Sequence, residues 1–87
     1  MIKQTVKIKN PTGLHLSPAG LLCKTAMQFE SKITFQTRNS NGNAKSVLSI
    51  LGACVKSGDD VEFIFEGADE VEAAREIIGM IESGLGE

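Results

Sequence analysis

The chain has 87 residues, of which 41% are hydrophobic and 23% are charged, and its formal net charge is −2. These values suit one small globular domain over residues 1–87, and they argue against a nucleic-acid partner, since such partners require an excess of Lys and Arg. No signal segment and no run of 18 apolar residues is present, so we expect a cytoplasmic protein with no membrane partner.

The first third of the chain predicts a strand, a turn and a helix. Apolar and polar residues alternate over 2–9, which predicts a half-buried strand with a lysine-rich outer face. A turn follows over 10–13, and Pro18 suits the first turn of a helix, where its missing N–H costs nothing. The spacing predicts one buried stripe, formed by Ala19, Leu22, Ala26 and Phe29. An adjacent stripe holds Gly20, Cys23, Lys24 and Met27.

The middle of the chain predicts two strands and a short helix. Ile33, Phe35 and Thr37 alternate as the second strand, and Asn41-Gly42 is a strong signal for a hairpin turn before a third strand over 43–45. Ser46 precedes "VLSILGACV", which predicts a short helix with Ser46 as its N-cap. In that helix we expect three residues to face the core, namely Ile50, Leu51 and Cys54, whereas Val47 and Leu48 point partly elsewhere.

The last third predicts a strand and a long helix. Val61, Phe63 and Phe65 alternate with acidic residues as the fourth strand. Asp69 is the expected N-cap of the helix, with Glu72 completing a capping box, and Gly84 or Gly86 ends it. Its apolar stripe comprises Val71, Ala74, Ile78, Ile81 and Leu85. The order βαββαβα predicts an α+β fold, in which three helices cover one face of a four-stranded, mainly antiparallel sheet.

His15 is the only histidine, and it stands just before the first predicted helix. From position alone it could be a surface residue or a capping helper. A functional interpretation rests on the helix terminus, where free N–H groups and the dipole stabilise an anion. A neutral imidazole is also a competent nucleophile near pH 7. His15 is therefore a candidate carrier of a phosphoryl group.

The other polar residues predict no complete catalytic set. Ser46 is either a plain cap or a second position suited to a phosphate, and Thr12 could simply hydrogen-bond within its turn. Cys23 and Cys54 are expected to be free thiols used as small hydrophobes, and with one histidine they offer no metal-ligand spacing. We therefore expect no metal, no cofactor and no self-sufficient enzyme.

Several motifs resemble those of the HPr family, the histidine-containing phosphocarriers of the bacterial phosphoenolpyruvate-dependent sugar phosphotransferase system. They are "TGLH" with "PA" following, "KS" before the short helix, "GADE" before the last helix and "GLGE" at the end. The resemblance covers the whole chain and implies an open-faced β-sandwich. It further implies that His15 accepts a phosphoryl group on Nδ1 from enzyme I and passes it to enzyme IIA.

The resemblance also implies a regulatory site and a partner surface. Ser46 would be the target of an ATP-dependent HPr kinase/phosphorylase, and the product would act with a catabolite control regulator. The partner surface would lie on the two predicted helices and comprise Gly20, Cys23, Lys24, Met27, Val47, Leu48 and Leu51. Without the resemblance, these apolar residues could be scattered surface positions. We expect a monomer.

The active-site run departs from the family pattern Gly-Leu/Ile-His-Ala-Arg-Pro. Here it reads Gly13-Leu14-His15-Leu16-Ser17-Pro18, so Leu16 replaces the alanine and Ser17 replaces the arginine. The supporting residues implied around His15 are Thr12, Gly13, Leu16, Ser17 and Pro18. Loss of the arginine removes a charge-assisted contact, which bears on the transfer rate and on partner identity more than on the fold.

Two alternatives to a phosphocarrier in sugar uptake remain open from the sequence. One is an HPr-like regulatory paralogue that acts mainly through Ser46 phosphorylation, with weak or specialised transfer at His15. The other is a small-molecule-binding regulatory domain of the ferredoxin-like kind, which shares the βαββαβ order. The presence of His15 favours the phosphocarrier over the regulatory paralogue. Ser17 in place of the family arginine favours the regulatory paralogue.

Overall fold

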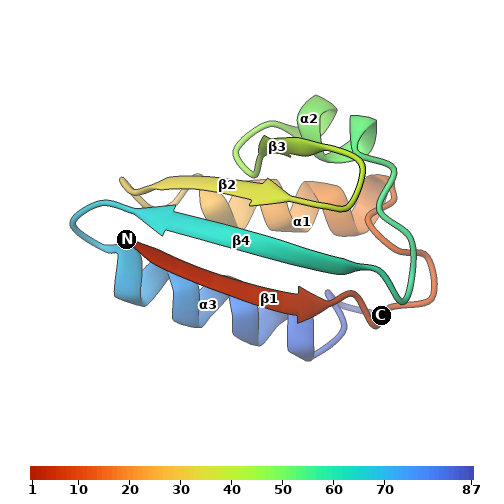
Figure 1. Cartoon of the computed structure of the whole chain (residues 1–87). Helices are drawn as coiled ribbons and strands as arrows, with labels where there is room; N and C mark the ends of the chain where they lie inside the picture. The colour runs from red at the N-terminus through yellow and green to blue at the C-terminus, as the bar shows by residue number, and fades with distance from the viewer.

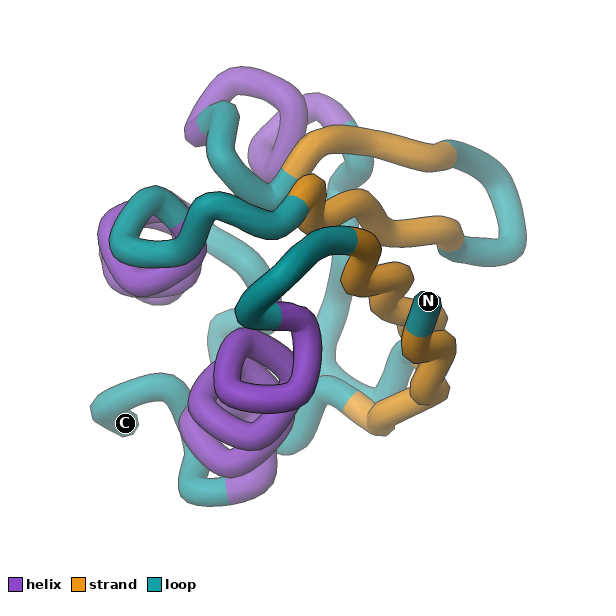
Figure 2. Tube along the Cα trace, turned by 90° about the vertical axis from the view of Figure 1, so that its left-hand side faces the viewer, coloured by secondary structure: helices purple, strands orange, loops and turns teal.

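The computed structural model describes all 87 residues as one sheet and three helices. The elements are β1 (Ile2–Lys7), α1 (Leu16–Ala26), β2 (Lys32–Gln36), β3 (Asn41–Asn43), α2 (Val47–Gly52), β4 (Asp60–Glu66) and α3 (Glu70–Glu82). The strand order is β1-β4-β2-β3, and every neighbouring pair is antiparallel. Figures 1 and 2 show the helices on one side of the sheet and no element on the other. This α+β, open-faced arrangement confirms the predicted fold. The longest helix, α3, has 13 residues, which is too short to span a membrane.

The core forms where the apolar faces of the strands meet the helices. In the sheet, Phe63 of β4 pairs with Phe35 of β2, and Phe65 pairs with Ile33. The rings of Phe35 and Phe63 are tilted at 50° with their centroids 6.1 Å apart. Burial of each such side chain contributes about 1.5–3 kcal/mol. These pairs fix the register, since a slip by one residue would turn the phenylalanines to water.

The chain reversal between β2 and β3 lies earlier than the sequence predicted. Asn41 and Gly42 belong to β3, so the predicted hairpin turn at these residues is wrong. The turn is instead closed by Thr37, whose N–H donates to the Ser40 carbonyl at 2.7 Å and whose hydroxyl accepts the Ser40 N–H.

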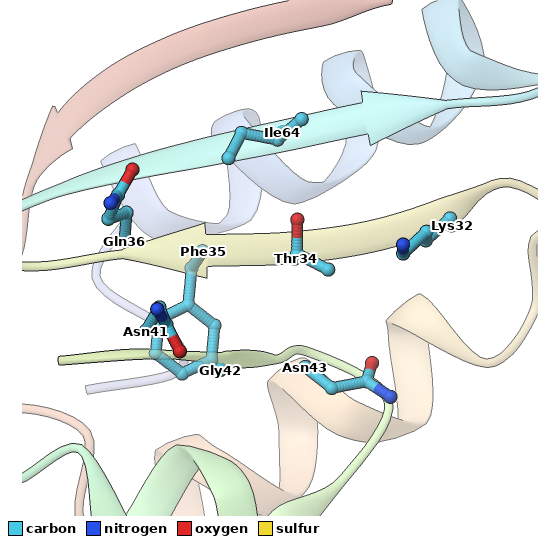
Figure 3. Close-up of a pocket in the computed structure, with 8 residues that line it drawn as sticks. All are labelled: Lys32, Thr34, Phe35, Gln36, Asn41, Gly42, Asn43 and Ile64. Carbon is cyan, nitrogen blue, oxygen red and sulfur yellow. The ribbon is translucent and has the colours of Figure 1, made fainter.

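Gly42 is required for packing, not for a turn. A Cβ at Gly42 would lie 2.5 Å from both Phe35 Cζ and Ser49 Oγ. Figure 3 shows Gly42 beside the Phe35 ring, in a pocket of about 450 Å³ that is lined mainly by polar residues of β2 and β3. The glycine therefore lets β3 and α2 approach the core closely.

Two residues predicted to face the core are exposed. Cys54 follows α2, which ends at Gly52, and its backbone turns into the left-handed region with φ 54° so that Val55 is buried in its place. Val71 is 58% exposed because the inward face of α3 is wider and begins later than the predicted stripe. That face comprises Ala73, Ala74, Ile77, Ile78 and Ile81.

The ends of α3 depart in part from the sequence prediction. Asp69 is the N-cap residue, but its side chain makes no capping bond, so the capping box with Glu72 is wrong. At the other end the prediction of Gly84 is confirmed. Gly84 has φ 95° and donates to the Ile81 carbonyl, while Leu85 N–H donates to the Met80 carbonyl, which is the pattern of a Schellman motif.

The Asp69 carboxylate joins two connections of the fold instead of capping α3. It accepts the N–H groups of Glu30 and Ser31 at 2.9 Å each, and it also accepts the Ser31 hydroxyl. Ser31 is buried, and Gly67 packs so closely on it that a Cβ there would lie 2.6 Å from Ser31 Oγ. The loop after α1 is thereby tied to the loop before α3.

Asp69→Asn should lower the urea midpoint of unfolding at pH 7, because an amide carries no charge and accepts fewer hydrogen bonds. Bonding to the Ser31 hydroxyl, and then to the Glu30 N–H, lowers the pKa of Asp69 below its ordinary 3.8. Its contribution is therefore present above that value and is lost as the pH falls through the lower folded pKa, so the two midpoints should converge below about pH 4. Glu76→Gln, at an exposed position of α3 that makes no hydrogen bond or ion pair, is the control. A gap between the midpoints that does not change with pH would contradict this role of the carboxylate.

Candidate functional site

His15 lies at the N-terminus of α1, as the sequence predicted. It is the N-cap residue, with extended backbone angles (φ −79°, ψ −176°), and its side chain is exposed and makes no capping bond. Its carbonyl accepts the Ala19 N–H at 2.8 Å, which is the first hydrogen bond of the helix. The imidazole therefore lies at the N-terminus of the helix, and neither of its ring nitrogens is used in a capping hydrogen bond.

The loop before His15 is seated on the connection between α2 and β4. Leu14 is buried, and its N–H donates to the Val55 carbonyl at 3.0 Å. Gly13 adopts φ 67°, and a Cβ there would lie 2.5 Å from the Val55 carbonyl oxygen and 2.8 Å from Lys56 Cα. Glycine is needed for both the backbone angle and the close approach. The contact with Val55 and Lys56 therefore fixes the position of the backbone that carries His15.

Two backbone N–H groups are available beside His15. Leu16 and Ser17 are the first two helical residues, so their N–H groups have no partner within the helix. Pro18 is buried and has no N–H, so an anion site here rests on Leu16 and Ser17 alone. The first turn contains no acidic residue that would compete for these donors. A phosphoryl group on the imidazole would lie at the positive end of the helix dipole.

A carboxylate from the far end of the chain reaches this loop, which the sequence did not predict. The Thr12 hydroxyl donates to Glu87, lying 2.8 Å from each carboxylate oxygen, and Asn10 Nδ2 donates to Glu87 Oε1 at 3.1 Å. Figure 1 shows this terminus beside the loop that follows β1. Asn10 is only 2% exposed, and its Nδ2 also donates to the Gly13 carbonyl at 2.6 Å. No local motif signals a contact between residues 75 or more positions apart.

The pKa of Glu87 is lowered by these contacts. The main causes are the hydrogen bond from the Thr12 hydroxyl and then the bond from the Asn10 amide, and the charge of His15 adds to them. The carboxylate is therefore ionised at neutral pH and lies within the electrostatic range of the imidazole.

Ser46 caps α2, which confirms the predicted cap. Its Oγ accepts the Ser49 N–H at 3.1 Å, and its carbonyl accepts the Ile50 N–H at 3.0 Å. The side chain is half-buried. The neighbouring Lys45 donates to the Phe29 carbonyl at 2.6 Å, so its ammonium ties the end of α1 to the start of α2.

The predicted partner surface falls on α1 and α2, which pack against each other. Three exposed apolar side chains mark it, with Leu16 63%, Met27 65% and Leu48 82% exposed. Lys24 is also exposed, whereas Gly20, Val47 and Leu51 are half-buried. Cys23 is only 8% exposed, so its predicted place on the surface is wrong. It follows Ala19 by one helical turn and therefore shares the inward face with Leu22 and Ala26.

Comparison of the sequence with known protein families identifies the family of this chain. The family model described as "PTS HPr component phosphorylation site" matches residues 2–83. The chain belongs to the HPr family. HPr proteins are phosphocarrier proteins and not enzymes, as the names of several relatives state. The predicted resemblance is thereby confirmed over nearly the whole chain.

The relatives include both phosphocarriers and an HPr-like protein. The chain is 33% identical over 87 residues to a phosphocarrier protein HPr of Neisseria meningitidis, covering 100% of this chain and 98% of that protein. It is 35% identical over 82 residues to the HPr-like protein Crh of Halalkalibacterium halodurans, covering 94% and 98% of the two chains.

Solved HPr structures share the fold. A crystal structure of HPr from Thermoanaerobacter tengcongensis has a TM-score of 0.96 and 42% identity, covering 100% of this chain and 98% of that one. A structure described as an HPr dimer from the same organism has a TM-score of 0.79 at the same identity and covers 100% of both chains.

Proposed function

We propose that this chain is a phosphocarrier in which His15 accepts a phosphoryl group from enzyme I and passes it to a sugar-specific enzyme IIA. The observation that carries the proposal is an exposed imidazole at the N-terminus of α1, beside the unpaired N–H groups of Leu16 and Ser17. These N–H groups would stabilise the negative charge of the phosphoryl group during transfer, as preorganised backbone dipoles do in other transfer reactions.

The transfer needs no group beyond a neutral imidazole and a phosphorylated donor. A lone pair on one ring nitrogen attacks phosphorus, a new N–P bond forms, and the bond from phosphorus to the donor breaks with its electron pair left on the donor. The proton on the other ring nitrogen keeps the imidazole ring neutral before the attack. In a second displacement a nucleophile of enzyme IIA attacks the phosphorus, a new bond to the acceptor forms, and the N–P bond breaks with its electron pair left on the imidazole nitrogen.

A docking surface for both partners is proposed next to the imidazole. Leu16, Met27 and Leu48 expose apolar side chains on α1 and α2, and Lys24 adds a positive charge among them. Leu16 and Met27 stand at opposite ends of α1, and Leu48 lies on the neighbouring α2, so a partner that spans both helices would cover all three side chains. Because the patch begins at Leu16, a partner seated on it would reach His15 directly. We infer that the chain acts as a monomer, since two copies joined over this patch would compete with the partners.

Incubation with phosphoenolpyruvate and enzyme I should add one acid-labile phosphoryl group to the wild type and none to His15→Ala. Intact-mass spectrometry before and after brief acid treatment measures it. Thermal melts of both proteins show whether the variant is folded. An acid-stable adduct, or equal labelling of His15→Ala, would remove His15 from the assignment.

Ser17→Arg should speed transfer to His15 from a standard enzyme I by roughly ten- to a hundredfold. A charge-assisted hydrogen bond is worth about 1.5–3 kcal/mol, and each 1.4 kcal/mol changes a rate tenfold. Ser17→Gln, which adds length without charge, is the matched control, and rapid-quench kinetics supply the rates. No gain in Ser17→Arg would mean that the site is adapted to a different partner.

A second function, regulation through Ser46, is favoured by a specific observation. Ser17 supplies no positive charge that would support transfer at His15. Ser46, in contrast, is the N-cap of α2, a position where a phosphate is stabilised. One relative is the HPr-like protein Crh, and a related Bacillus subtilis structure is described as a catabolite repression protein. We propose that an HPr kinase/phosphorylase modifies Ser46 and that the product acts with a catabolite control regulator. A phosphate there would favour the helix terminus by about 0.3–1 kcal/mol and hinder docking near Val47 and Leu48.

ATP and an HPr kinase/phosphorylase should label the wild type and not Ser46→Ala. Ser57→Ala, which removes an exposed serine outside α2, should label like the wild type. Incorporation of radioactive phosphate, followed by peptide mapping, locates the site. Labelling of Ser46→Ala at the wild-type level would contradict the assignment.

A further inference from the structure

One peptide group beyond the end of α1 is held from both sides by opposite charges. The Phe29 carbonyl accepts a hydrogen bond from the Lys45 ammonium at 2.6 Å. The N–H of the same peptide, which belongs to Glu30, donates to the Asp69 carboxylate at 2.9 Å. Hydrogen bonds in such a chain polarise and strengthen one another. The connection after α1 is therefore joined both to the segment before α2 and to the segment before α3.

The Lys45 ammonium is the part of this arrangement that is free to change its partner. It has three N–H donors, of which one is used, and neither ion pair of the structure includes it. The Lys45 backbone is fixed, because its N–H donates to Asn43 Oδ1 at 2.9 Å and Ala44 before it is fully buried. A half-buried cation without an acidic partner thus lies one residue before Ser46, the serine that would receive a phosphate.

We propose that Lys45 is a positioning residue for the regulation at Ser46: its ammonium holds the Phe29 carbonyl while Ser46 is unmodified, and it moves to the phosphate when Ser46 is phosphorylated. The proposal rests on Ser46 being the modified residue. A phosphate carries about −1.5 to −2 charge near pH 7, and its oxygens are stronger acceptors for an ammonium than a neutral carbonyl is. The stem of a lysine is flexible, so the ammonium reaches a neighbouring side chain while the backbone stays in place.

Loss of the bond to Phe29 would change the end of α1 and not only the start of α2. The released Phe29 carbonyl must bond to water, and the Glu30 N–H loses the polarisation that strengthens its bond to Asp69. Phe29 closely follows Met27, which is the C-cap of α1 and an exposed apolar residue of the proposed docking surface. Modification of Ser46 would thereby loosen the α1 end of that surface, in addition to the charge that it places near α2.

The first test uses protein in which Ser46 is incorporated as phosphoserine during synthesis, so that no kinase is needed. Phosphorus NMR over a pH series gives the second pKa of the phosphate. An ammonium paired with the phosphate favours the dianion, so this pKa should be higher by about 0.2–0.7 in Lys45→Met. Lys45→Arg, which keeps the charge, should match the otherwise unchanged chain. Lys9→Met, which removes an exposed lysine that makes no hydrogen bond or ion pair, should match it as well.

Equal pKa values of the phosphate with Lys45 and in Lys45→Met would overturn the proposal. An equal rise in Lys9→Met would reduce the effect to net charge and would also overturn it.

The second test follows the bonds that Lys45 leaves. Amide hydrogen exchange at Glu30 should be about two- to tenfold faster in the phosphoserine protein, which corresponds to the loss of one hydrogen bond. Lys45→Met should show the same increase without a phosphate, and a phosphate should then add nothing further. The NMR resonance of the Phe29 carbonyl carbon should move in the same direction in both proteins. An exchange rate and a carbonyl resonance that do not respond to the phosphate would overturn the proposal.

The two tests separate failure of this proposal from failure of the proposed regulation. If HPr kinase/phosphorylase labels Ser46→Ala as well as the wild type, the assignment of Ser46 fails, and the incorporated phosphoserine still decides whether Lys45 pairs with a phosphate there. If the kinase labels Ser46 but the phosphate leaves the Phe29 carbonyl unchanged, the role of Lys45 is overturned and Ser46 remains the modified residue. The Phe29 resonance compares the same chain with and without the phosphate, so it decides the question even where Lys45→Met is unfolded.

Discussion

The contact of the loop over 10–14 with Val55 and Lys56 is the constraint on which the site depends. Gly13 lies too close to the Val55 carbonyl for any side chain, and Leu14 donates a backbone hydrogen bond to the same oxygen. Leu14 is then buried, and the next residue must turn outward to begin α1. An exposed histidine at a helix N-terminus is the direct result. Moving this loop would displace the imidazole from the N–H groups of Leu16 and Ser17.

The electrostatics of the site are set by backbone groups more than by side-chain cations. The helix terminus supplies two N–H donors and the positive end of a dipole, while the charged side chain that is hydrogen-bonded to the loop before His15 is the carboxylate of Glu87. A helix terminus cannot move as a flexible arginine can, because its donors are part of the backbone of the fold. Such a site can stabilise a phosphoryl group modestly, and modest stabilisation suits a group that must be handed on.

Packing between α1 and α2 links the two proposed phosphorylation sites. His15 begins α1 and Ser46 begins α2, and the Lys45 ammonium bonds the carbonyl of Phe29 just beyond the end of α1. The exposed apolar residues Leu16 and Leu48 lie in the first turns of these two helices. Ser46 therefore lies near the end of α1, whereas His15 lies at the other end of this helix, beside the segment that follows α2.

The sequence by itself determined the element order, the core strands and the two helix termini that carry His15 and Ser46, because these follow from local periodicity and capping chemistry. Only the tertiary structure decided features that depend on residues distant in the chain. Asn41 and Gly42 pair with β2 as part of a strand, where the Phe35 ring and Ser49 leave no room for a Cβ at Gly42, and the Asp69 side chain bonds Ser31 instead of capping α3. Cys23 turned inward because the buried face of α1 is wider than one stripe. Glu87 reached Thr12 across 75 positions, a contact that no local pattern encodes because it exists only once α3 has packed against the sheet.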